Sequence, residues 1–447
     1  MGVAADLPPG RTEAGVSPQA WYAIGVFALA AMLSYTDRLI LNLLVSPIRA
    51  EMAITDTQVS FLQGAAFAVI YSIAGLPMGR HADRHGRRNL ILAGVLVWSF
   101  ATLLCGLAQS YGQLFAARIL VGVGEAALAP AALSMIPDLF PAHRRGTAVG
   151  IFLAGMVMGG GTATLTGGVL IELYASGALS GLPLVGELPP WRAVLVTLGL
   201  VGGVMALLVL PIREPQRRES LGGKDNTGLG PLLRYMGKHR AAFVLLLGGL
   251  TLTQLVDYGT NSWTPSLLMR VHGFSAAETG AALGGILIGV AGLGTVSGGI
   301  LADFLEQRGV TGGKLIIAAL ATSLAVPCMF FSVSGSTTLL LTLFGLFAFL
   351  LAVGASTGIA AVLDLVPSEL RGMTTAIQAF LFTAIGLGMG PTVVALTTDH
   401  VFGDPNAVGW SILVTCMPLM ALAALALWRA KPHYRRTRQA LADRTSH

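Results

Sequence analysis

A positive and a negative charge interrupt the largely apolar segment 114–136, in the stretch Arg118-Ile-Leu-Val-Gly-Val-Gly-Glu125. On an α-helix, residues seven apart differ by about 20° in direction and by roughly 10 Å along the axis, so these two side chains share one face. A charge at membrane depth costs at least about 2.5 kcal/mol unless it meets a partner or water. A second charge pair, Asp37-Arg38, interrupts the first apolar run. The sequence therefore predicts a membrane protein whose helices hold these four ionisable side chains around a buried cavity.

The composition also indicates a membrane protein. Hydrophobic residues make up 54% of the 447 residues and charged residues only 11%, whereas soluble domains are about 25% charged. Too few charges remain to cover a soluble surface of this size. The net charge of +6 does not indicate a nucleic-acid-binding protein, because the basic residues are spread over short turns between apolar runs.

Twelve apolar runs are long enough to span a bilayer, which takes about 20 residues. They lie at 20–46, 58–79, 89–109, 113–136, 147–172, 192–211, 241–268, 276–302, 313–333, 337–364, 373–397 and 407–428. The turns after the even-numbered runs carry most of the basic residues, whereas the opposite turns carry only Arg49, Arg192 and Arg270. By the positive-inside rule we expect the basic turns and both termini in the cytoplasm, and the chain in the inner (plasma) membrane.

The two halves of the sequence repeat each other. Asp138-Leu-Phe-Pro141, followed by Arg145, recurs as Asp364-Leu-Val-Pro367 followed by Arg371, and Gly79-x3-Asp83 recurs as Gly299-x3-Asp303. We therefore predict an all-α fold with two pseudo-symmetric six-helix bundles and a substrate site between them near the midplane. The expected parts are a cytoplasmic tail (1–19), the N-terminal bundle (20–211), a cytoplasmic linker (212–240), the C-terminal bundle (241–430) and a basic cytoplasmic tail (431–447).

The turn Gly79–Arg88 resembles the G-x3-D-R-x-G-R-R signature of the major facilitator superfamily, and the resemblance covers all twelve runs. In that family this turn latches the cytoplasmic ends of the two bundles. A positive-inside anchor would explain the arginines, but neither the glycines nor Asp83. The resemblance implies a cytoplasmic gate built from Gly79, Asp83, Arg84, Gly86, Arg87, Arg88, Asp138, Arg145, Asp364 and Arg371.

Two branches of the superfamily resemble the sequence more narrowly. Tyr35-Thr-Asp37-Arg38, Arg118-x6-Glu125, Val121-Gly-Val-Gly-Glu-Ala126 and Asp138-Leu-Phe140 are similar to the Spinster branch, whose members move lysophospholipids and sphingoid lipids. The Asp-Arg and Arg-x6-Glu arrangement also resembles the anion:cation symporters, which move sugar acids with protons. The resemblance implies a proton-coupled transporter that works by alternating access. We expect a lysolipid-like or sphingolipid-like amphiphilic anion as substrate, because runs eight to ten are almost purely apolar; a small organic anion is the alternative.

The four buried charges suit proton coupling. A low dielectric favours the neutral carboxyl group, and a nearby guanidinium favours the carboxylate. We expect Asp37 and Glu125 to load and release protons, with Arg118 as the partner of Asp37. Arg38 and Arg118 would attract the anionic group of the substrate, because arginine presents a planar fork of donors. The alternative is a static structural network of salt bridges.

Other polar residues in the apolar runs indicate a function less specifically than the four charged residues do. Asp257 and Asn261 in run seven and Gln378 in run eleven are assigned to substrate binding, although an outer-gate hydrogen bond at Asp257, or a bond between helices at Gln378, would also explain them. The glycine-rich segment 155–168 predicts close helix packing, because it follows no strand as a phosphate loop would.

The sequence shows neither metal-ligand spacing nor a recognisable nucleophile–base pair, so we expect no metal, no cofactor and no enzyme activity. The expected partners are protons, membrane lipid and a small-molecule or lipid substrate, without nucleic acid, for a monomeric chain.

Overall fold

The computed structural model describes residues 16–216 and 229–445. Its helices are α1 (Pro18–Leu39), α2 (Leu41–Met52), α3 (Asp56–Ser60), α4 (Ala66–Arg84), α5 (Arg87–Leu107), α6 (Tyr111–Glu125), α7 (Leu128–Leu139), α8 (Ala142–Ala175), α9 (Pro190–Val209), α10 (Leu229–Lys238), α11 (Arg240–Val271), α12 (Ala276–Gly285), α13 (Gly292–Gln307), α14 (Gly313–Cys328), α15 (Thr337–Leu363), α16 (Arg371–Leu381), α17 (Gly388–Leu396) and α18 (Val408–Thr445). Short π-helical segments lie at Phe61–Ala65, Ile286–Ala291, Phe382–Leu387 and Thr397–Phe402, and 3-10 turns at Met329–Val333, Ser368–Leu370 and Pro405–Ala407. The described residues include no strand.

Twelve segments built from these helices are long and apolar enough to cross a membrane. The first joins α1 and α2 (Pro18–Met52), and the last is Pro405–Leu441. The described part of the expected linker contains α10, while residues 217–228 lie outside the described residues. The helix α18 continues to Thr445, so the expected basic tail is helical as far as the structure describes it.

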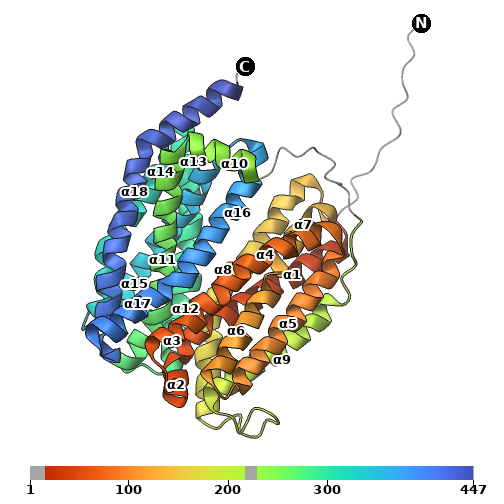
Figure 1. Ribbon diagram of the computed structural model, residues 1–447, viewed down its shortest axis with the longest axis vertical. Helices are drawn as coiled ribbons and strands as arrows, with labels where there is room; N and C mark the ends of the chain where they lie inside the picture. Colours follow the sequence, from red (N-terminus) through yellow and green to blue (C-terminus); the bar gives the residue numbers. More distant parts are fainter. Residues whose placement is uncertain (1–15, 217–228, 446–447) are drawn as a thin grey trace.

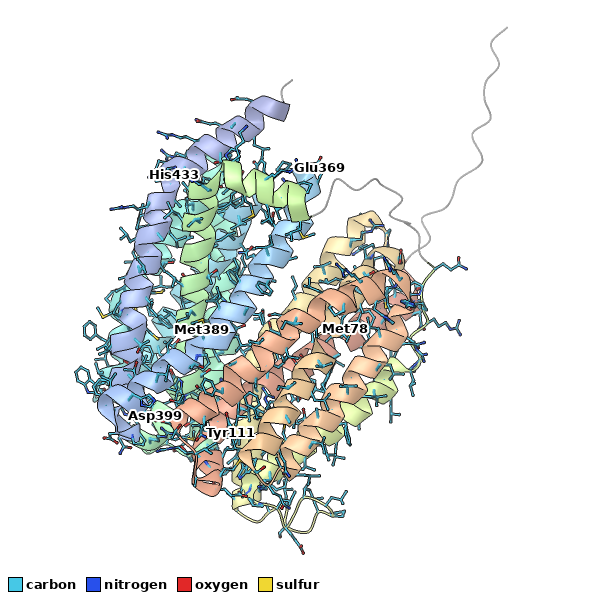
Figure 2. All side chains as sticks on the ribbon, viewed as in Figure 1. Met78, Tyr111, Glu369, Met389, Asp399 and His433 are labelled. Atoms are coloured by element: carbon cyan, nitrogen blue, oxygen red, sulfur yellow. The ribbon has the colours of Figure 1, made fainter. Side chains whose placement is uncertain are left out.

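The helices form two bundles, α1–α9 and α11–α18 (Figure 1). The bundles converge at the end where α2 and α3 lie, here called the Asp56 end, and they separate toward the other end, here called the Arg87 end. Figure 2 places Tyr111 and Asp399 at the Asp56 end and Glu369 at the Arg87 end. The predicted fold class, with twelve spans in two six-helix bundles, is confirmed.

Capping boxes start two helices at the Asp56 end. Thr55 and Gln58 cap α3, and Ser275 and Glu278 cap α12; in each pair the hydroxyl accepts from one backbone N–H and the longer side chain accepts from the other. The first box puts Asp56 in the first turn of α3. A carboxylate is favoured there, because the backbone N–H groups of a helix N-terminus carry partial positive charge.

Glycines let α8 and α12 cross closely between the bundles. A Cβ atom at Gly280 would collide with the backbone oxygen of Thr164, and one at Gly284 would lie 3.0 Å from the backbone oxygen of Gly161. Helices in a membrane approach this closely only where small residues face each other. The close packing predicted for segment 155–168 is therefore confirmed, and part of it lies at the contact between the two bundles.

Candidate functional site

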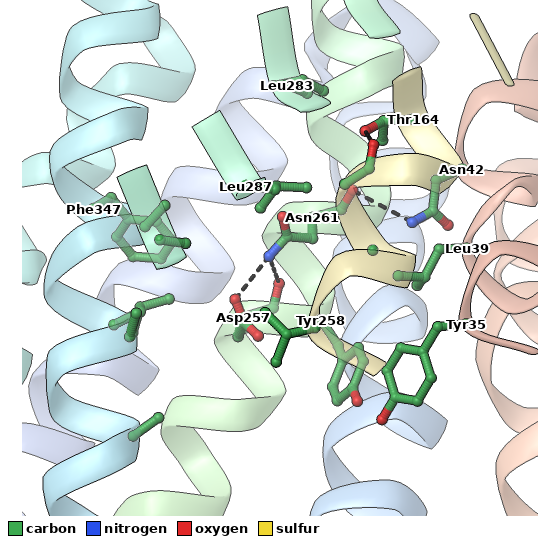
Figure 3. Close-up of a pocket in the computed structure, with 18 of the residues that line it drawn as sticks. Tyr35, Leu39, Asn42, Thr164, Asp257, Tyr258, Asn261, Leu283, Leu287 and Phe347 are labelled. Atoms are coloured by element: carbon green, nitrogen blue, oxygen red, sulfur yellow. Dashed lines mark hydrogen bonds between the residues drawn. The ribbon is translucent and has the colours of Figure 1, made fainter. Parts of the chain in front are cut away.

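A cavity of about 230 Å³ lies between the bundles (Figure 3). The N-terminal bundle lines it from α1, α2 and α8, and the C-terminal bundle from α11, α12, the segment Ile286–Ala291 and α15. Its polar lining residues are Tyr35, Asn42, Thr164, Gln254, Asp257, Tyr258 and Asn261. The remaining walls are largely aliphatic and aromatic, including Leu39, Met156, Leu283, Leu287, Phe344, Phe347 and Leu351. Such a site combines an apolar volume with a few fixed polar groups.

Asp257 and Asn261 lie one helical turn apart on α11 and face the cavity together (Figure 3). The amide nitrogen of Asn261 donates to Oδ1 of Asp257 over 2.7 Å and to the backbone oxygen of Asp257 over 3.0 Å. Asn42 of the N-terminal bundle donates to the backbone oxygen of Asn261 over 3.5 Å. The structure thus brings these two predicted substrate-binding residues to the cavity wall.

All four predicted charges lie inside the N-terminal bundle, and each bonds to a residue of another element. Arg38 of α1 forms an ion pair with Glu125 of α6, with 2.8 Å between Nη2 and Oε2. Ser34 donates to the same carboxylate oxygen over 2.7 Å. Arg38 is 4% exposed and Glu125 is 1% exposed. The pair is therefore held in a low dielectric, where the two charges depend strongly on each other.

The partner of Asp37 differs from the predicted one. The carboxylate of Asp37 accepts a hydrogen bond from the hydroxyl of Thr102 on α5. Arg118 reaches Asp37 only at its backbone oxygen, over 3.5 Å, and its Nε donates to the backbone oxygen of Leu62 over 3.2 Å. Adjacent helical residues point about 100° apart, and this separation directs Asp37 toward α5 and Arg38 toward α6. All these side chains are buried.

Each of the four charged side chains keeps one buried polar atom without a hydrogen-bond partner among the described residues. These atoms are Asp37 Oδ1, Arg38 Nε, Arg118 Nη2 and Glu125 Oε1. An unsatisfied buried polar group costs about 1–3 kcal/mol, and more when it is charged. Among the described residues, the cluster is therefore not a fully satisfied structural network.

The charged cluster lies beside the cavity rather than in its wall. Neither Arg38 nor Arg118 lines the cavity, whereas Tyr35 does. The guanidinium carbon of Arg38 lies 4.5 Å from the centre of the Tyr35 ring and 4.3 Å from that of Phe67. These contacts are within the range of cation–π attraction. Tyr35 therefore connects the cluster to the cavity. Gln378 is 3% exposed and lies outside the cavity lining.

The predicted gate residues at the Arg87 end bond inside their own bundles. Arg87 binds Asp138 over 2.5 Å and Glu214 over 2.8 Å, and it also donates to the backbone oxygens of Ser134 and Pro215. Arg88 donates to the backbone oxygen of Leu210 over 2.5 Å, and Arg145 donates to those of Phe140 and Pro137. A Cβ atom at Gly79 would lie 4.0 Å from Pro130, and one at Gly86 would lie 3.9 Å from Asn89, so neither position is tightly packed; Arg84 is exposed. The side chain of Asp83 lies outside the described part of the chain.

The C-terminal bundle repeats this arrangement. Lys314 binds Asp364 over 3.1 Å, at the position where Arg87 binds Asp138 in the other half. Glu306 also binds Lys314, over 3.1 Å, and Tyr434 donates to Asp364 over 3.1 Å. Arg371 is exposed. The internal repeat thus extends from the sequence to a matched ion pair in each bundle.

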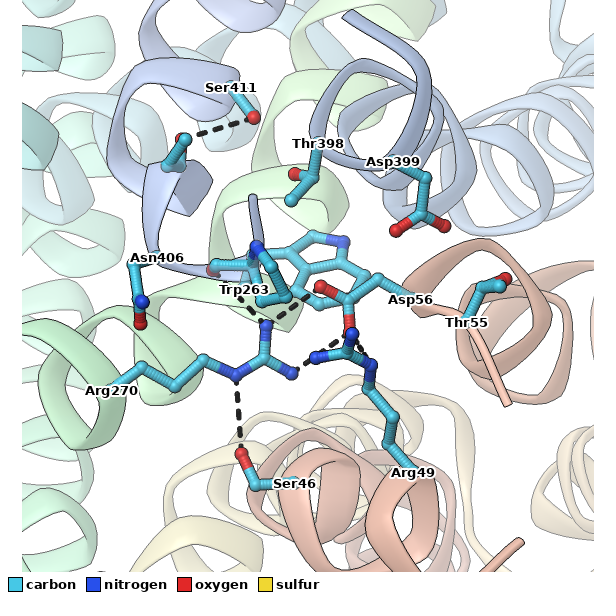
Figure 4. A network of polar contacts seen from close by, with 12 residues as sticks. Ser46, Arg49, Thr55, Asp56, Trp263, Arg270, Thr398, Asp399, Asn406 and Ser411 are labelled. Atoms are coloured by element: carbon cyan, nitrogen blue, oxygen red, sulfur yellow. Dashed lines mark hydrogen bonds and ion pairs between the residues drawn. The ribbon is translucent and has the colours of Figure 1, made fainter. Parts of the chain in front are cut away.

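A network that the sequence analysis missed joins the bundles at the Asp56 end (Figure 4). Arg270 of α11 donates to both carboxylate oxygens of Asp56, over 2.7 and 2.9 Å, and to Ser46 over 3.3 Å. Arg49 approaches Asp56 at 3.6 Å. Nearby, Asp399 accepts from the backbone N–H of Thr57 over 2.7 Å. The sequence feature that could have indicated this network is that Arg49 and Arg270 are two of the three basic residues in the turns at this end.

Comparison with known proteins places this architecture in a family. A sequence model of the Major Facilitator Superfamily matches residues 27–337. An MFS-type efflux pump of Mycolicibacterium smegmatis is 29% identical over 428 residues, which cover 94% of each chain. A probable galactarate/D-glucarate transporter of Bacillus subtilis is 25% identical over 424 residues, covering 87% of this chain and 86% of the relative.

A solved structure is similar over almost the whole length. It is the crystal structure of a bacterial homolog to the human lysosomal transporter Spinster, in an inward-facing and unoccupied conformation. The two chains share 25% of their residues and superpose with a TM-score of 0.78, covering 95% of this chain and 98% of the other. The predicted resemblance to the Spinster branch is confirmed. The chain belongs to the Major Facilitator Superfamily and is a multi-pass membrane transporter.

Proposed function

We propose that the protein is a proton-coupled secondary active transporter that moves a lysolipid-like or sphingoid-lipid-like amphiphile by alternating access. The observation that carries the proposal is the buried ion pair between Arg38 and Glu125. The ring of Tyr35 separates this pair from a cavity between the bundles. A buried ionisable cluster inside a membrane marks a functional site by default. We place both termini and the Arg87 end in the cytoplasm, and the chain, as a monomer, in the plasma membrane.

Proton coupling follows from the charge balance of the cluster. With both carboxylates ionised, the charges of Asp37, Glu125, Arg38 and Arg118 sum to zero. Protonation of Glu125 removes the counter-charge of Arg38, whose guanidinium does not deprotonate. Arg38 would then move relative to Tyr35, whose ring lines the cavity. Loading a proton would in this way change the shape and polarity of the substrate site.

Alternating access follows from where the bundles are joined. At the Asp56 end, Arg270 and Asp399 of one bundle bind Asp56 and Thr57 of the other. At the Arg87 end, the ion pairs of Arg87 and Asp364 lie within single bundles. We infer that this conformation faces the cytoplasm. In the opposite conformation, the signature turn Gly79–Arg88, with Asp83 and Arg87 as its gate residues, would meet the Asp364–Arg371 segment of the other bundle.

An amphiphile suits the cavity because its polar groups lie on α1, α2, α8 and α11, whereas α12, the segment Ile286–Ala291 and α15 supply apolar surface. Asp257 and Asn261 lie on α11, while Leu287 and Phe347 supply apolar surface for an acyl chain. The anionic head group expected from the sequence depends on Arg38 and Arg118. Because neither arginine lines the cavity in this conformation, an anion would reach Arg38 only after its pair with Glu125 opens. Gln378 would contribute only after a similar movement.

A small organic anion is the second candidate substrate. It is favoured by the Asp-Arg and Arg-x6-Glu arrangement and by the similarity to the galactarate/D-glucarate transporter. Such a substrate is hydrophilic and would require polar groups on every wall of the cavity, including those formed by α12 and α15. The apolar walls formed by α12 and α15 favour the amphiphile.

Transport by the purified protein in proteoliposomes tests the proposal. Under an imposed pH gradient, movement of NBD-labelled lysophosphatidylethanolamine between leaflets is followed by dithionite quenching, and uptake of radiolabelled galactarate is measured in parallel. We expect gradient-dependent movement of the lysolipid, and we expect Glu125→Gln and Asp37→Asn to abolish the dependence on the gradient. Arg118→Ala should also impair transport.

The matched control is Glu187→Gln, because Glu187 is an exposed carboxylate outside the membrane spans. It should leave gradient-driven movement unchanged. Proton-driven transport that survives both Glu125→Gln and Asp37→Asn would disprove the coupling assignment. If galactarate were taken up and the lysolipid were not moved, the substrate would be a small organic anion rather than a lysolipid-like amphiphile.

A further inference from the structure

The charge of the substrate cavity is carried by one residue. Among the described residues that line the cavity, Asp257 is the sole acidic side chain, and none is a lysine, arginine or histidine. Asp257 also forms no ion pair among the described residues; its recorded side-chain partner is the neutral amide of Asn261. A half-buried carboxylate that faces a largely apolar cavity without a counter-charge is costly, and an entering cation would supply one.

Aromatic rings line the same cavity. Tyr258 follows Asp257 in α11, Tyr35 of α1 lies beside Tyr258, and Phe347 of α15 lies on the opposite wall (Figure 3). Rings of this kind attract ammonium groups through their π faces, and aromatic cages are a common means of binding quaternary ammonium. This observation is independent of the carboxylate, and it points to the same ligand chemistry.

The positive charges of the N-terminal bundle are held away from the cavity. Arg38 is bound to Glu125 and lies behind the ring of Tyr35. Arg118 donates to backbone oxygens below the surface of the cavity. These guanidinium groups therefore do not neutralise Asp257 by direct contact. The groups near Asp257 are Asn261, which donates to its carboxylate, and Tyr258, the next residue of α11; the phenol of Tyr35 on α1 lines the same cavity.

We propose that the cavity recognises the ammonium group of a cationic or zwitterionic amphiphile, with Asp257 as counter-ion, Tyr35 and Tyr258 as ring contacts, and the apolar wall at Leu287 and Phe347 holding its chain. This inference rests on the proposed function and names the head-group chemistry of its substrate. In this proposal Asp257 of the C-terminal bundle binds the charged group of the substrate. The residues proposed for proton coupling, Asp37 and Glu125, lie in the N-terminal bundle. Protonation of Asp257 would release the ammonium group.

Equilibrium binding tests this recognition without any proton gradient. The probe is tritiated decyltrimethylammonium, added to the full-length protein in nanodiscs and measured by scintillation proximity, with decyl sulfate and decyl maltoside as anionic and neutral competitors of equal chain length. We expect the cation to bind and decyl sulfate to compete no better than decyl maltoside. Asp257→Asn should weaken cation binding by roughly tenfold to a hundredfold, the range expected for loss of a charged contact.

Two further variants separate recognition from folding. Asp257→Glu keeps the charge and should retain cation binding to within a few fold, whereas Glu187→Gln should match the unmodified protein. Lowering the pH should weaken cation binding to the unmodified protein but not to Asp257→Asn. Preferential binding of decyl sulfate, or cation binding unaffected by Asp257→Asn, would overturn the inference. Because no gradient is present, a failure of proton coupling leaves this result unchanged, and the two failures are distinguishable.

Discussion

Arg270 of α11 donates two hydrogen bonds to the carboxylate of Asp56 on α3, over 2.7 and 2.9 Å, and thereby ties the two bundles together at one end of the molecule. Asp56 is 0% exposed. Such a bidentate guanidinium–carboxylate pair is geometrically specific as well as strong. Opening this end of the cavity requires that these bonds break. The pair therefore has a direct effect on the balance between the two conformations of a transporter.

Asp56→Asn should shift the protein toward a conformation that is open at the Asp56 end. Breaking a buried ion pair costs about 3–5 kcal/mol, which exceeds a hundredfold change in an equilibrium. Spin labels at Gln109→Cys and Leu339→Cys, exposed on opposite bundles, would report longer distances by double electron–electron resonance. The three native cysteines are buried and should not interfere.

Arg49→Gln is the matched control for this experiment. Arg49 approaches the same carboxylate at 3.6 Å, and its side chain is 32% exposed. This contact is longer than the two bonds from Arg270, and the Arg49 side chain partly reaches solvent, so it should contribute less than the Arg270 pair. The distance distribution of the labelled protein should therefore hardly change. An unchanged distribution in Asp56→Asn would show that the pair does not hold this end closed.

Gly280→Val should slow transport about tenfold or more, because the added side chain would collide with the backbone of α8 at Thr164. Overpacking of this kind costs about 1–3 kcal/mol, and each 1.4 kcal/mol on a barrier is a tenfold change in rate. Gly285→Val on the same helix meets nothing within 4 Å and serves as control. Initial rates of lysolipid movement in proteoliposomes would check both. Equal rates for the two variants would show that the α8–α12 contact does not limit transport.

Arg87→Gln should destabilise the N-terminal bundle by about 3 kcal/mol, because it removes the buried ion pair between Arg87 and Asp138. Lys314→Gln should act in the same direction on the C-terminal bundle, through Asp364. Arg371→Gln changes an exposed residue and should remain within about 0.5 kcal/mol. Thermal unfolding in detergent, followed by reaction of the buried cysteines with a thiol dye, measures all three. A normal melting temperature for Arg87→Gln would show that its contacts serve only gating.

The fold could be predicted from the sequence because the membrane leaves few alternatives. Backbone groups in lipid must bond within the segment, so runs of about 20 apolar residues become helices. The repeat between the Asp138 and Asp364 segments indicated two equivalent bundles, and the structure places a matching ion pair in each. The sequence did not indicate that the basic stretch after Trp428 continues α18 to Thr445.

The gathering of the four charges was predictable, but their pairing was not. Each buried charge requires a partner, so Asp37, Arg38, Arg118 and Glu125 had to lie near one another. Helical geometry gives the angle between Asp37 and Arg38, but not how α5 and α6 are rotated about them. That rotation depends on packing, here including the rings of Phe67 and Tyr71 against Arg38. As a result, Arg38 rather than Arg118 forms the ion pair.

The network at the Asp56 end escaped prediction for a different reason. Asp56 lies just before the second apolar run, where an acidic residue costs little and attracts no notice. Its partner Arg270 is 214 residues away in the chain, so no local spacing connects them. The same limit applies to the cavity wall, because the packing of α1 against α8 decides that Tyr35 lines the cavity and Arg38 does not.

Arg38→Gln and Glu125→Gln should each lower the melting temperature, while the double substitution should recover much of the loss. Either single change leaves one member of a buried pair uncompensated, at a cost of about 3–5 kcal/mol, and residues in direct contact couple by about 0.5–3 kcal/mol. Melting curves of the three variants would measure the two losses and the recovery. Additive losses in the double variant would mean that the two side chains do not depend on each other, and that the coupling route through Arg38 and Tyr35 does not exist.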